Sequence, residues 1–244
     1  MVKYGQVVYT PDRRPLTSYP RKLMKYLFEE IYPVGRAVLR VDPVVYADLG
    51  CGRGDFITPM AELLGGRATI YGVDAELHPE MEELIQHSNT TTCLATVCFR
   101  QIVLDRQFLP FDTSSVDVVF TKSVIEHLTD WRWFLQEIHR ILRPGGRLVI
   151  MTPDWHSQWR MFWDDPTHVH PFTVQGLKDA LLMTDFEKVY VRKFYQLPVL
   201  WRAPWLTIVS ELLQLLIRPD VRIRNRFIRW SVELMLLGTA VKGE

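Results

Sequence analysis

The chain has 244 residues, of which 48% are hydrophobic and 23% are charged, with a formal net charge of +1 at pH 7. These values are typical of a globular α/β domain with a substantial core, and they exclude a low-complexity or fibrous chain. A near-neutral charge does not predict a nucleic-acid partner.

Cysteine usage and hydropathy bear on where the protein works. The chain has three cysteines, an odd number with no C-x-x-C spacing, which favours a reducing compartment. Its first residues lack the apolar core of a signal peptide, and no uncharged stretch of about 18 residues predicts a membrane span. We therefore expect a cytoplasmic protein. The pattern predicts no particular oligomeric state.

Strand-like and helix-like segments alternate along the chain. Apolar residues at helical spacing predict helices over 20–40, from the glycine-rich turn to Leu64, over 79–88 and over 130–142. Short apolar runs predict strands over 44–49, 68–74, 95–104, 116–121 and 147–152, with a turn at 143–146. This alternation predicts an α/β fold with a doubly wound, mainly parallel sheet, whose ligands lie beyond the carboxyl ends of the strands.

A glycine-rich loop follows the first predicted strand. Asp48 is followed by glycines at alternate positions, Gly50, Gly52 and Gly54. Glycine permits a sharp turn and the close approach of a ligand to the backbone. The dinucleotide-binding pattern would need glycine at position 55, which is Asp55. An acid beside the loop suits a cationic cofactor and would repel a pyrophosphate.

The G-x-G-x-G pattern, with an acid two residues ahead, resembles motif I of the class I S-adenosylmethionine-dependent methyltransferases. The resemblance extends over residues 44–190 and implies a Rossmann-like sheet of seven strands. It also implies S-adenosylmethionine as cofactor, with its methionine end held by Asp48, Gly50 and Gly52. Asp74 ends the second predicted strand and would take the ribose, and Asp105 the adenine. Further cofactor contacts are expected from Cys51, Gly54, Ala75, Arg106 and Ser123. The alternative is that these acids cap helices or satisfy turns.

Two later segments, 123–128 and 163–173, supply candidate residues for the acceptor site. In a doubly wound sheet both would follow strand ends and border one pocket. They would bring together Glu126, His127, Asp165, His168 and His170. We expect catalytic roles for the three histidines and Asp165, with one histidine as the base that removes the acceptor proton. A purely structural loop is the alternative.

The same residues resemble the acceptor sites of the O-methyltransferases of ubiquinone biosynthesis and of small-RNA 2′-hydroxyl methylation. Those families carry a Glu-x-x-Glu-His element that binds a divalent cation. Here Ser123 stands in place of the first glutamate. The resemblance implies a divalent cation held by Glu126, His127 and His168.

Residues 195–244 differ in composition from the domain over 1–194, and we expect them to form a helical C-terminal appendage. Tryptophan and proline alternate at its start, an apolar segment follows over 207–217, and arginines interleave with aromatic residues over 222–230. A second apolar segment runs over 232–241. Packing on the sheet, peripheral contact with the cytoplasmic face of a membrane, and contact with single-stranded RNA are the three interpretations.

Together these features predict an S-adenosylmethionine-dependent methyltransferase that acts on an oxygen. The loop 165–173 and the segment Leu197-Pro198 with Trp201 are similar to bacterial methyltransferases of surface-polysaccharide and glycolipid clusters. That similarity implies a sugar or lipid-linked glycan hydroxyl as the acceptor. The alternatives are a small aromatic or isoprenoid metabolite, or a cofactor-binding scaffold without catalysis.

Overall fold

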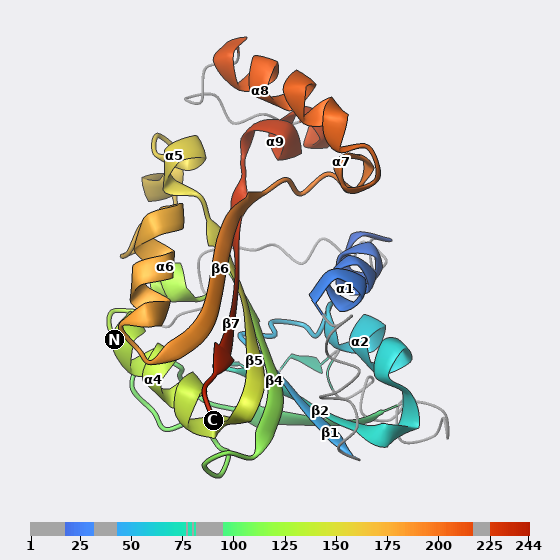
Figure 1. Cartoon of the computed structure of the whole chain (residues 1–244), viewed down its shortest axis with the longest axis vertical. Helices are drawn as coiled ribbons and strands as arrows, with labels where there is room; N and C mark the ends of the chain where they lie inside the picture. The colour runs from blue at the N-terminus through green and yellow to red at the C-terminus, as the bar shows by residue number, and fades with distance from the viewer. Residues whose placement is uncertain (1–17, 32–42, 77, 80, 82–94, 217–224) are drawn as a thin grey trace.

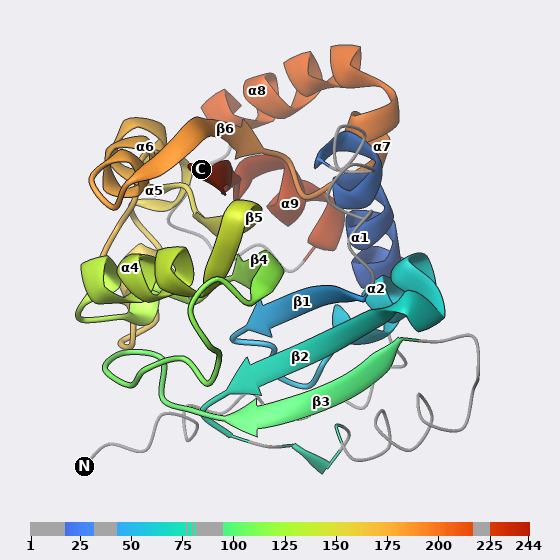
Figure 2. The same cartoon turned by 60° about the horizontal axis from the view of Figure 1, so that its bottom comes forward.

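The computed structural model describes residues 18–31, 43–76, 78–79, 81, 95–216 and 225–244. They form a seven-stranded sheet in the order β3-β2-β1-β4-β5-β7-β6, with helices around it (Figures 1 and 2). Only β7 runs antiparallel to its neighbours, β5 and β6. The strands are β1 (Val44–Leu49), β2 (Ala68–Asp74), β3 (Thr96–Gln101), β4 (Val116–Lys122), β5 (Leu142–Pro153), β6 (Phe186–Phe194) and β7 (Met235–Lys242). The predicted α/β class and mainly parallel sheet are confirmed.

Helices cover both faces of the sheet. They are α1 (Ser18–Ile31), α2 (Ile57–Leu64), α4 (Trp131–Ile141), α5 (Trp155–Gln158), α6 (Val174–Leu182), α7 (Pro198–Arg202), α8 (Thr207–Leu216) and α9 (Arg226–Val232). Helices α1 and α2 cover one face, and α4 and α6 the other (Figure 2). Successive side chains of β4 point to opposite faces of the sheet. Val118 and Phe120 therefore pack in the core under α1 and α2, and Val119 packs in the core under α4 and α6.

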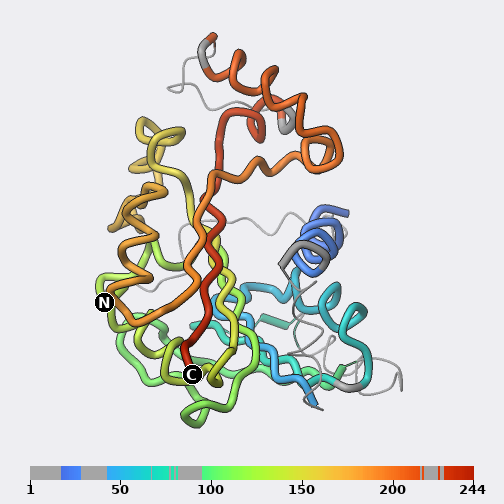
Figure 3. Tube along the Cα trace, in the orientation of Figure 1, coloured from blue at the N-terminus to red at the C-terminus, as the bar shows by residue number. Residues whose placement is uncertain are grey.

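The first helix also contacts the C-terminal part of the chain: Figure 2 shows α1 beside α7, and Figure 3 traces the chain that connects them. The ring of Tyr19 lies 4.7 Å from that of Trp230, and the ring of Tyr26 lies 4.8 Å from that of Trp201. These contacts join residues about two hundred positions apart in sequence. The segment from α7 to α9 is therefore packed against the domain through aromatic side chains.

Several predicted boundaries need correction. The residues predicted as a turn at 143–146 lie within β5, which begins at Leu142; the strand accommodates Gly145 at a φ of 76° and a register shift against β4 between Val116 and Val118. The predicted helix over 20–40 begins at Ser18, and its part beyond residue 31 lies outside the described residues. Most of the predicted helix over 79–88 also lies outside them.

The larger correction concerns the segment 232–241, which we expected within a helical appendage. Most of it forms β7, which lies inside the sheet between β5 and β6. A Cβ at Gly238 would lie 2.8 Å from Cγ2 of Ile150, its partner on β5, so glycine leaves room for the Ile150 side chain within the sheet. Residue 195 therefore does not begin a separate unit. The helical segment, from Pro198 to Val232, is an insertion between two paired strands.

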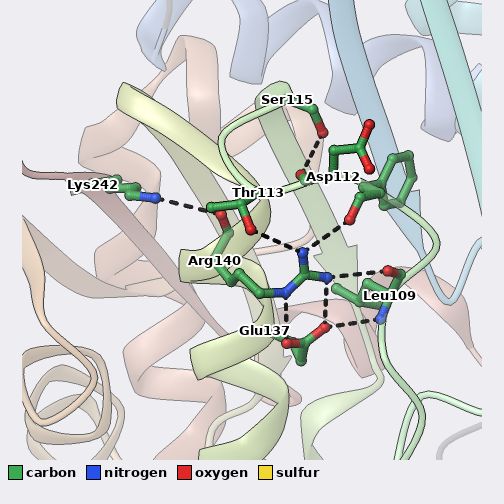
Figure 4. A network of polar contacts seen from close by, with 8 residues as sticks. Leu109, Asp112, Thr113, Ser115, Glu137, Arg140 and Lys242 are labelled. Carbon is green, nitrogen blue, oxygen red and sulfur yellow. Dashed lines mark hydrogen bonds and ion pairs between the residues drawn. The ribbon is translucent and has the colours of Figure 1, made fainter.

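A polar network joins helix α4, the chain between β3 and β4, and the end of β7 (Figure 4). Arg140 donates from Nε and Nη2 to the Glu137 carboxylate at 2.8 and 2.9 Å. Nη2 also donates to the Leu109 carbonyl, and Nη1 donates to the Phe111 carbonyl. Lys242 at the end of β7 donates to the carbonyls of Arg140 and Leu142. The network secures the chain between β3 and β4 to helix α4. None of the helices among the described residues has the length and apolar character to cross a membrane.

We expect Leu236→Ala to lower the free energy of unfolding by about 2–4 kcal/mol, because it opens a cavity beside the sheet. Leu236 has no exposed surface, whereas Leu216 at the end of α8 is 80% exposed. Leu216→Ala is therefore the matched control, with an expected effect within about 0.5 kcal/mol. Urea denaturation of both variants measures the difference. Equal effects would contradict the position of β7 inside the sheet.

Candidate active site

The glycine loop turns sharply at the carboxyl end of β1. Gly50, Gly52 and Gly54 have φ values of 77°, 54° and 82°, all in the region that favours glycine. The turn is secured by the neighbouring strand, since the Val73 carbonyl accepts from the amides of Gly50 at 2.7 Å and Cys51 at 3.2 Å. The neighbouring strand β2 thus helps to shape the loop.

The first two glycines of the loop have different surroundings. A Cβ at Gly50 would lie 2.1 Å from Val124 Cγ2, so this glycine makes room for the loop that follows β4. A Cβ at Gly52 would meet no described atom within 4 Å. The space above Gly52 is the part of the loop open to a ligand. The sequence predicted ligand approach for both positions, whereas at Gly50 a protein side chain fills the space.

Asp74 lies at the end of β2, as predicted, and faces the glycine loop. Its Oδ2 accepts from the Gly52 amide at 2.7 Å, and its Oδ1 lies 3.4 Å from the Glu76 amide. The contact with Gly52 is the turn-satisfying role that the sequence left as an alternative. It also holds the carboxylate at the rim of the open space beside Gly52.

Buried charges gather where β1 and β4 end. Asp48 is 1% exposed, and among the described residues its Oδ2 has no hydrogen-bond partner. Burial raises the pKa of Asp48 to about 8, and the negative charges of Asp74 and Asp55 add to the effect. Burial lowers the pKa of Lys122 at the end of β4, although the acids Glu126, Asp48 and Asp55 oppose that shift. A cation placed here would favour the charged form of Asp48.

Other predicted cofactor residues have mainly structural contacts. Both oxygens of Asp105 accept from Thr129, at 2.6 Å from its amide and 2.6 Å from its hydroxyl. Arg106 is largely exposed and 4.0 Å from Asp105. The carbonyl of Ala75 accepts from Gln101, and Ser123 has a φ of 57° with its hydroxyl 3.4 Å from Lys122 Nζ. These contacts leave the predicted adenine role of Asp105 untested.

The structure brings together three of the predicted acceptor-site residues. Ligand atoms of Glu126, His127 and His168 all lie within 4.8 Å of one another. Glu126 is 1% exposed; its Oε2 accepts from Thr152 at 2.9 Å, and among the described residues its Oε1 has no partner. Burial raises the pKa of Glu126 to about 7. Its backbone carbonyl accepts hydrogen bonds from the amides of Val169 and His170. These bonds join the segments 123–128 and 163–173, which we call the site loops.

Hydrogen bonds assign the tautomer of each histidine in this cluster. Nδ1 of His168 lies 2.6 Å from the Phe162 carbonyl, which can only accept, so Nδ1 carries the proton. Thr167 donates its hydroxyl to Asp165 at 2.6 Å and therefore accepts from Nδ1 of His127 at 2.8 Å. In the neutral form of either ring, these bonds place the lone pair on Nε2. Burial and the neighbouring His168 lower the pKa of His127, which favours the neutral form.

The other two predicted catalytic residues lie at the edge of this cluster. Asp165 Oδ2 is 4.0 Å from His168 Nε2, and hydrogen bonds from Thr167 hold the pKa of Asp165 below its ordinary value despite partial burial. His170 contributes its amide to the Glu126 carbonyl at 3.1 Å, but its ring is not in the group of ligand atoms. Of the three histidines expected to have catalytic roles, His127 and His168 lie in this group.

The sequence analysis missed Lys122, Thr152 and Thr167. The charge of Lys122 interacts with those of Glu126, Asp48 and Asp55. Thr152 donates a hydrogen bond to Glu126, and the Thr167 hydroxyl connects His127 to Asp165. A lysine at the end of an otherwise apolar strand is a signal that could have identified the first. Nothing in the local sequence marks either threonine.

Comparisons with known proteins agree with this geometry. Residues 47–150 match the family described as Methyltransferase domain. A solved S-adenosylmethionine-dependent methyltransferase from Mesorhizobium loti is 20% identical with a TM-score of 0.58, over 86% of this chain and 97% of that one. The matched segment, which runs from β1 through the glycine loop into β5, is therefore similar to a methyltransferase domain, and the solved structure shares the fold of this chain.

Two curated relatives are similar to this chain over part of its length. The malonyl-[acyl-carrier protein] O-methyltransferase 1 of Coxiella burnetii is 29% identical over 55% of this chain and 43% of its own length. The ubiquinone biosynthesis O-methyltransferase of Bartonella tribocorum is 27% identical over 57% of this chain and 55% of its own length. The chain spans about half or less of the length of the curated relatives it matches most strongly.

Alanine at Gly52 and alanine at Gly50 are expected to impair different properties, ligand affinity in the first case and stability of the fold in the second. Gly52→Ala places a methyl group in the open space, so we expect a folded protein whose affinity for S-adenosylhomocysteine falls about tenfold or more. Gly50→Ala has similar backbone strain of roughly 1–2 kcal/mol and also collides with Val124, so it destabilises the fold itself. Thermal unfolding and calorimetric titration separate the two effects. Undiminished binding by Gly52→Ala would contradict a ligand in that space.

The raised pKa of Asp48 predicts a pH-dependent stability of the cofactor-free protein. Between its unfolded pKa of about 4 and its folded pKa of about 8, Asp48 holds a proton that the unfolded chain releases. Raising the pH therefore favours unfolding. We expect the stability of Asp48→Asn relative to the parent to rise by about 1 kcal/mol per pH unit from about pH 5 to pH 8.

Urea denaturation at several pH values measures this difference. Asp164→Asn removes an exposed carboxylate and is the control, with an expected difference that does not change with pH. A pH-independent difference for Asp48→Asn would show that the Asp48 carboxyl ionises normally in the folded protein.

Proposed function

We propose that this chain transfers a methyl group from S-adenosylmethionine to a hydroxyl oxygen. The observation that carries the proposal is the contact between the two loops: Val124 packs against Gly50, and two residues later Glu126 begins the cluster with His127 and His168. A cofactor held at the glycine loop would thus lie beside a group of proton acceptors. That arrangement suits an acceptor whose proton must be removed.

The glycine loop and Asp74 would hold the cofactor. The open space at Gly52 admits the methionine end, and the Asp74 carboxylate at its rim is positioned for the ribose hydroxyls. Asp48 is buried next to this loop, where a sulfonium cation would stabilise its ionised form. The remaining contacts that we propose are Gly50, Cys51, Gly54, Ala75, Asp105, Arg106 and Ser123.

His168 is the general base in this proposal. Its Nδ1 carries a proton and donates it in a hydrogen bond to the Phe162 carbonyl. The lone pair on Nε2 is therefore the one that accepts the proton of the acceptor. As the acceptor oxygen bonds to the methyl carbon, the carbon–sulfur bond breaks and the hydroxyl proton passes to Nε2. The products are the methylated acceptor and S-adenosylhomocysteine. Asp165, 4.0 Å away, would stabilise the imidazolium that forms.

The same cluster fits a divalent cation. Glu126 Oε1 is buried and lacks a partner among the described residues, and both histidine Nε2 atoms carry lone pairs. Oxygen and imidazole ligands at this spacing suit a borderline divalent metal. Glu126, His127 and His168 would hold it, and when bound it would lower the pKa of a coordinated hydroxyl. The missing acid at Ser123 leaves three protein ligands.

The acceptor is a choice between two chemical classes. The sequence favours a sugar or lipid-linked glycan hydroxyl as the acceptor. Matched relatives are named for quinones, for a polyketide and for an acyl-carrier substrate. These names support the second class, a hydroxyl on a small aromatic or isoprenoid metabolite. A scaffold without catalysis would bind the cofactor and transfer nothing to either class.

We expect His168→Ala to lower kcat by about a hundredfold or more while leaving the affinity for S-adenosylhomocysteine unchanged, because the base is lost and the glycine loop is intact. His156→Ala is the control, since that ring is 64% exposed and lies outside the cluster. Transfer of radiolabelled methyl to phenolic quinone precursors and to glycolipids measures turnover. Full activity of His168→Ala would remove this residue from the chemistry.

The same assay tests the metal and the scaffold. Loss of activity after chelation that is restored by Co²⁺ or Zn²⁺ would support the cation at Glu126, His127 and His168. Activity that survives chelation would leave the histidine acting as a base. Cofactor binding without transfer to either acceptor class would favour the scaffold.

A further inference from the structure

Helix α8 is amphipathic, but its apolar side points away from the protein. Trp205, in the 3-10 turn Pro204–Leu206 that leads into α8, and four residues of α8 at the positions i+3, i+4, i+7 and i+11 from it form one stripe. Every one of them is exposed, by 70% at Trp205, 61% at Ile208, 49% at Val209, 54% at Leu212 and 80% at Leu216. We call these residues the α8 stripe. A surface helix that stabilises its own domain has the opposite arrangement.

The inward side of α8 is attached by polar contacts. Ser210 is only 3% exposed, and Gln214 donates to the Ser231 carbonyl at 3.1 Å. Gln214 also hydrogen-bonds to Tyr195 on the segment that leaves β6. Because Ser210 and Gln214 face the protein, the α8 stripe lies on the side of the helix that faces away from it.

The α8 stripe lies at the same end of the molecule as the site loops. Helix α8 packs on α9, and both lie beyond the ends of β5 and β6, as does α5 (Figure 1). The turn between α9 and β7 is bonded to the loop after β5, since Leu234 accepts from the Asp154 amide at 3.0 Å and from Gln158 at 2.6 Å. A surface bound through α8 would face the end of the sheet that carries the site.

We propose that the α8 stripe binds the surface of an anionic lipid bilayer. Tryptophan at the head of an apolar stripe is typical of helices that lie in the membrane interface. The sequence from 202 to 229 contains six arginines and two acidic residues, a net charge of +4. Arg202, next to the stripe, is exposed. Apolar burial and attraction to anionic lipid headgroups would act together on this helix.

Charge also favours a bilayer over a second copy of this chain. Two copies of this chain carry the same positive sequence charge over 202–229, so their approach through this region costs free energy by repulsion. An anionic bilayer reverses the sign of that interaction. The proposal does not depend on methyl transfer, and the measurement of binding uses neither cofactor nor acceptor.

Vesicle flotation of the full chain tests the proposal. We expect the protein to float with vesicles of phosphatidylcholine that contain about one third phosphatidylglycerol, and much less with phosphatidylcholine alone or at high salt. The double variant Ile208→Ser with Leu212→Ser should lower the partition coefficient about tenfold or more, because both side chains are exposed in the free protein and buried in the lipid. Leu182→Ser, at a position 49% exposed in α6, is the matched control and should bind as the parent does.

Three results would overturn the proposal. The parent protein would fail to float with anionic vesicles, or the double variant would bind them as tightly as the parent. Alternatively, light scattering would show a dimer that the double variant dissociates, with no flotation, and the stripe would then be a contact between copies. Because the substituted side chains are exposed, circular dichroism should show all variants folded.

Discussion

The absence of a side chain at residue 50 is the constraint on which the site depends. Val124 occupies the space that a Cβ would need, so the loop after β1 and the loop after β4 are in contact. The Val73 carbonyl holds the turn from the other side. A residue larger than glycine at position 50 would push the two loops apart. The open space above Gly52 would then no longer lie beside the cluster at Glu126.

The electrostatics of the site follow from this close packing. Carboxyl groups from β1, β2 and the loop after β4 lie together with Lys122, in surroundings where burial disfavours charge. Asp48 and Glu126 consequently have raised pKa values and hold protons more tightly than exposed acids do. A site of this kind gains free energy when a cation enters it. That property fits a sulfonium cofactor at the glycine loop and a divalent cation or an imidazolium at the acceptor side.

The topology joins the acceptor side of the site to the C-terminal helices. Strand β7 pairs with β5 and β6, so the chain must leave the sheet after β6 and return beside the end of β5. Helices α7, α8 and α9 make that excursion, and Leu234 binds the loop that follows β5 on the way back. The insertion is thereby attached to the site end of the sheet. A lipophilic acceptor, taken from a surface to which α8 binds, would reach this end without crossing the domain.

The sequence by itself determined the strands β1, β2 and β4, the glycine loop, and the grouping of Glu126, His127 and His168, because these depend on local period, on turn-forming residues and on the motif resemblance. It did not reveal β7, since an apolar run of that length has the same pattern in a helix as in a buried strand. Nor did it reveal Lys122 among the acids, Val124 against Gly50, or the outward direction of the α8 stripe. Those features are contacts between segments far apart in the chain, and only the tertiary structure decides which atoms fill a given space.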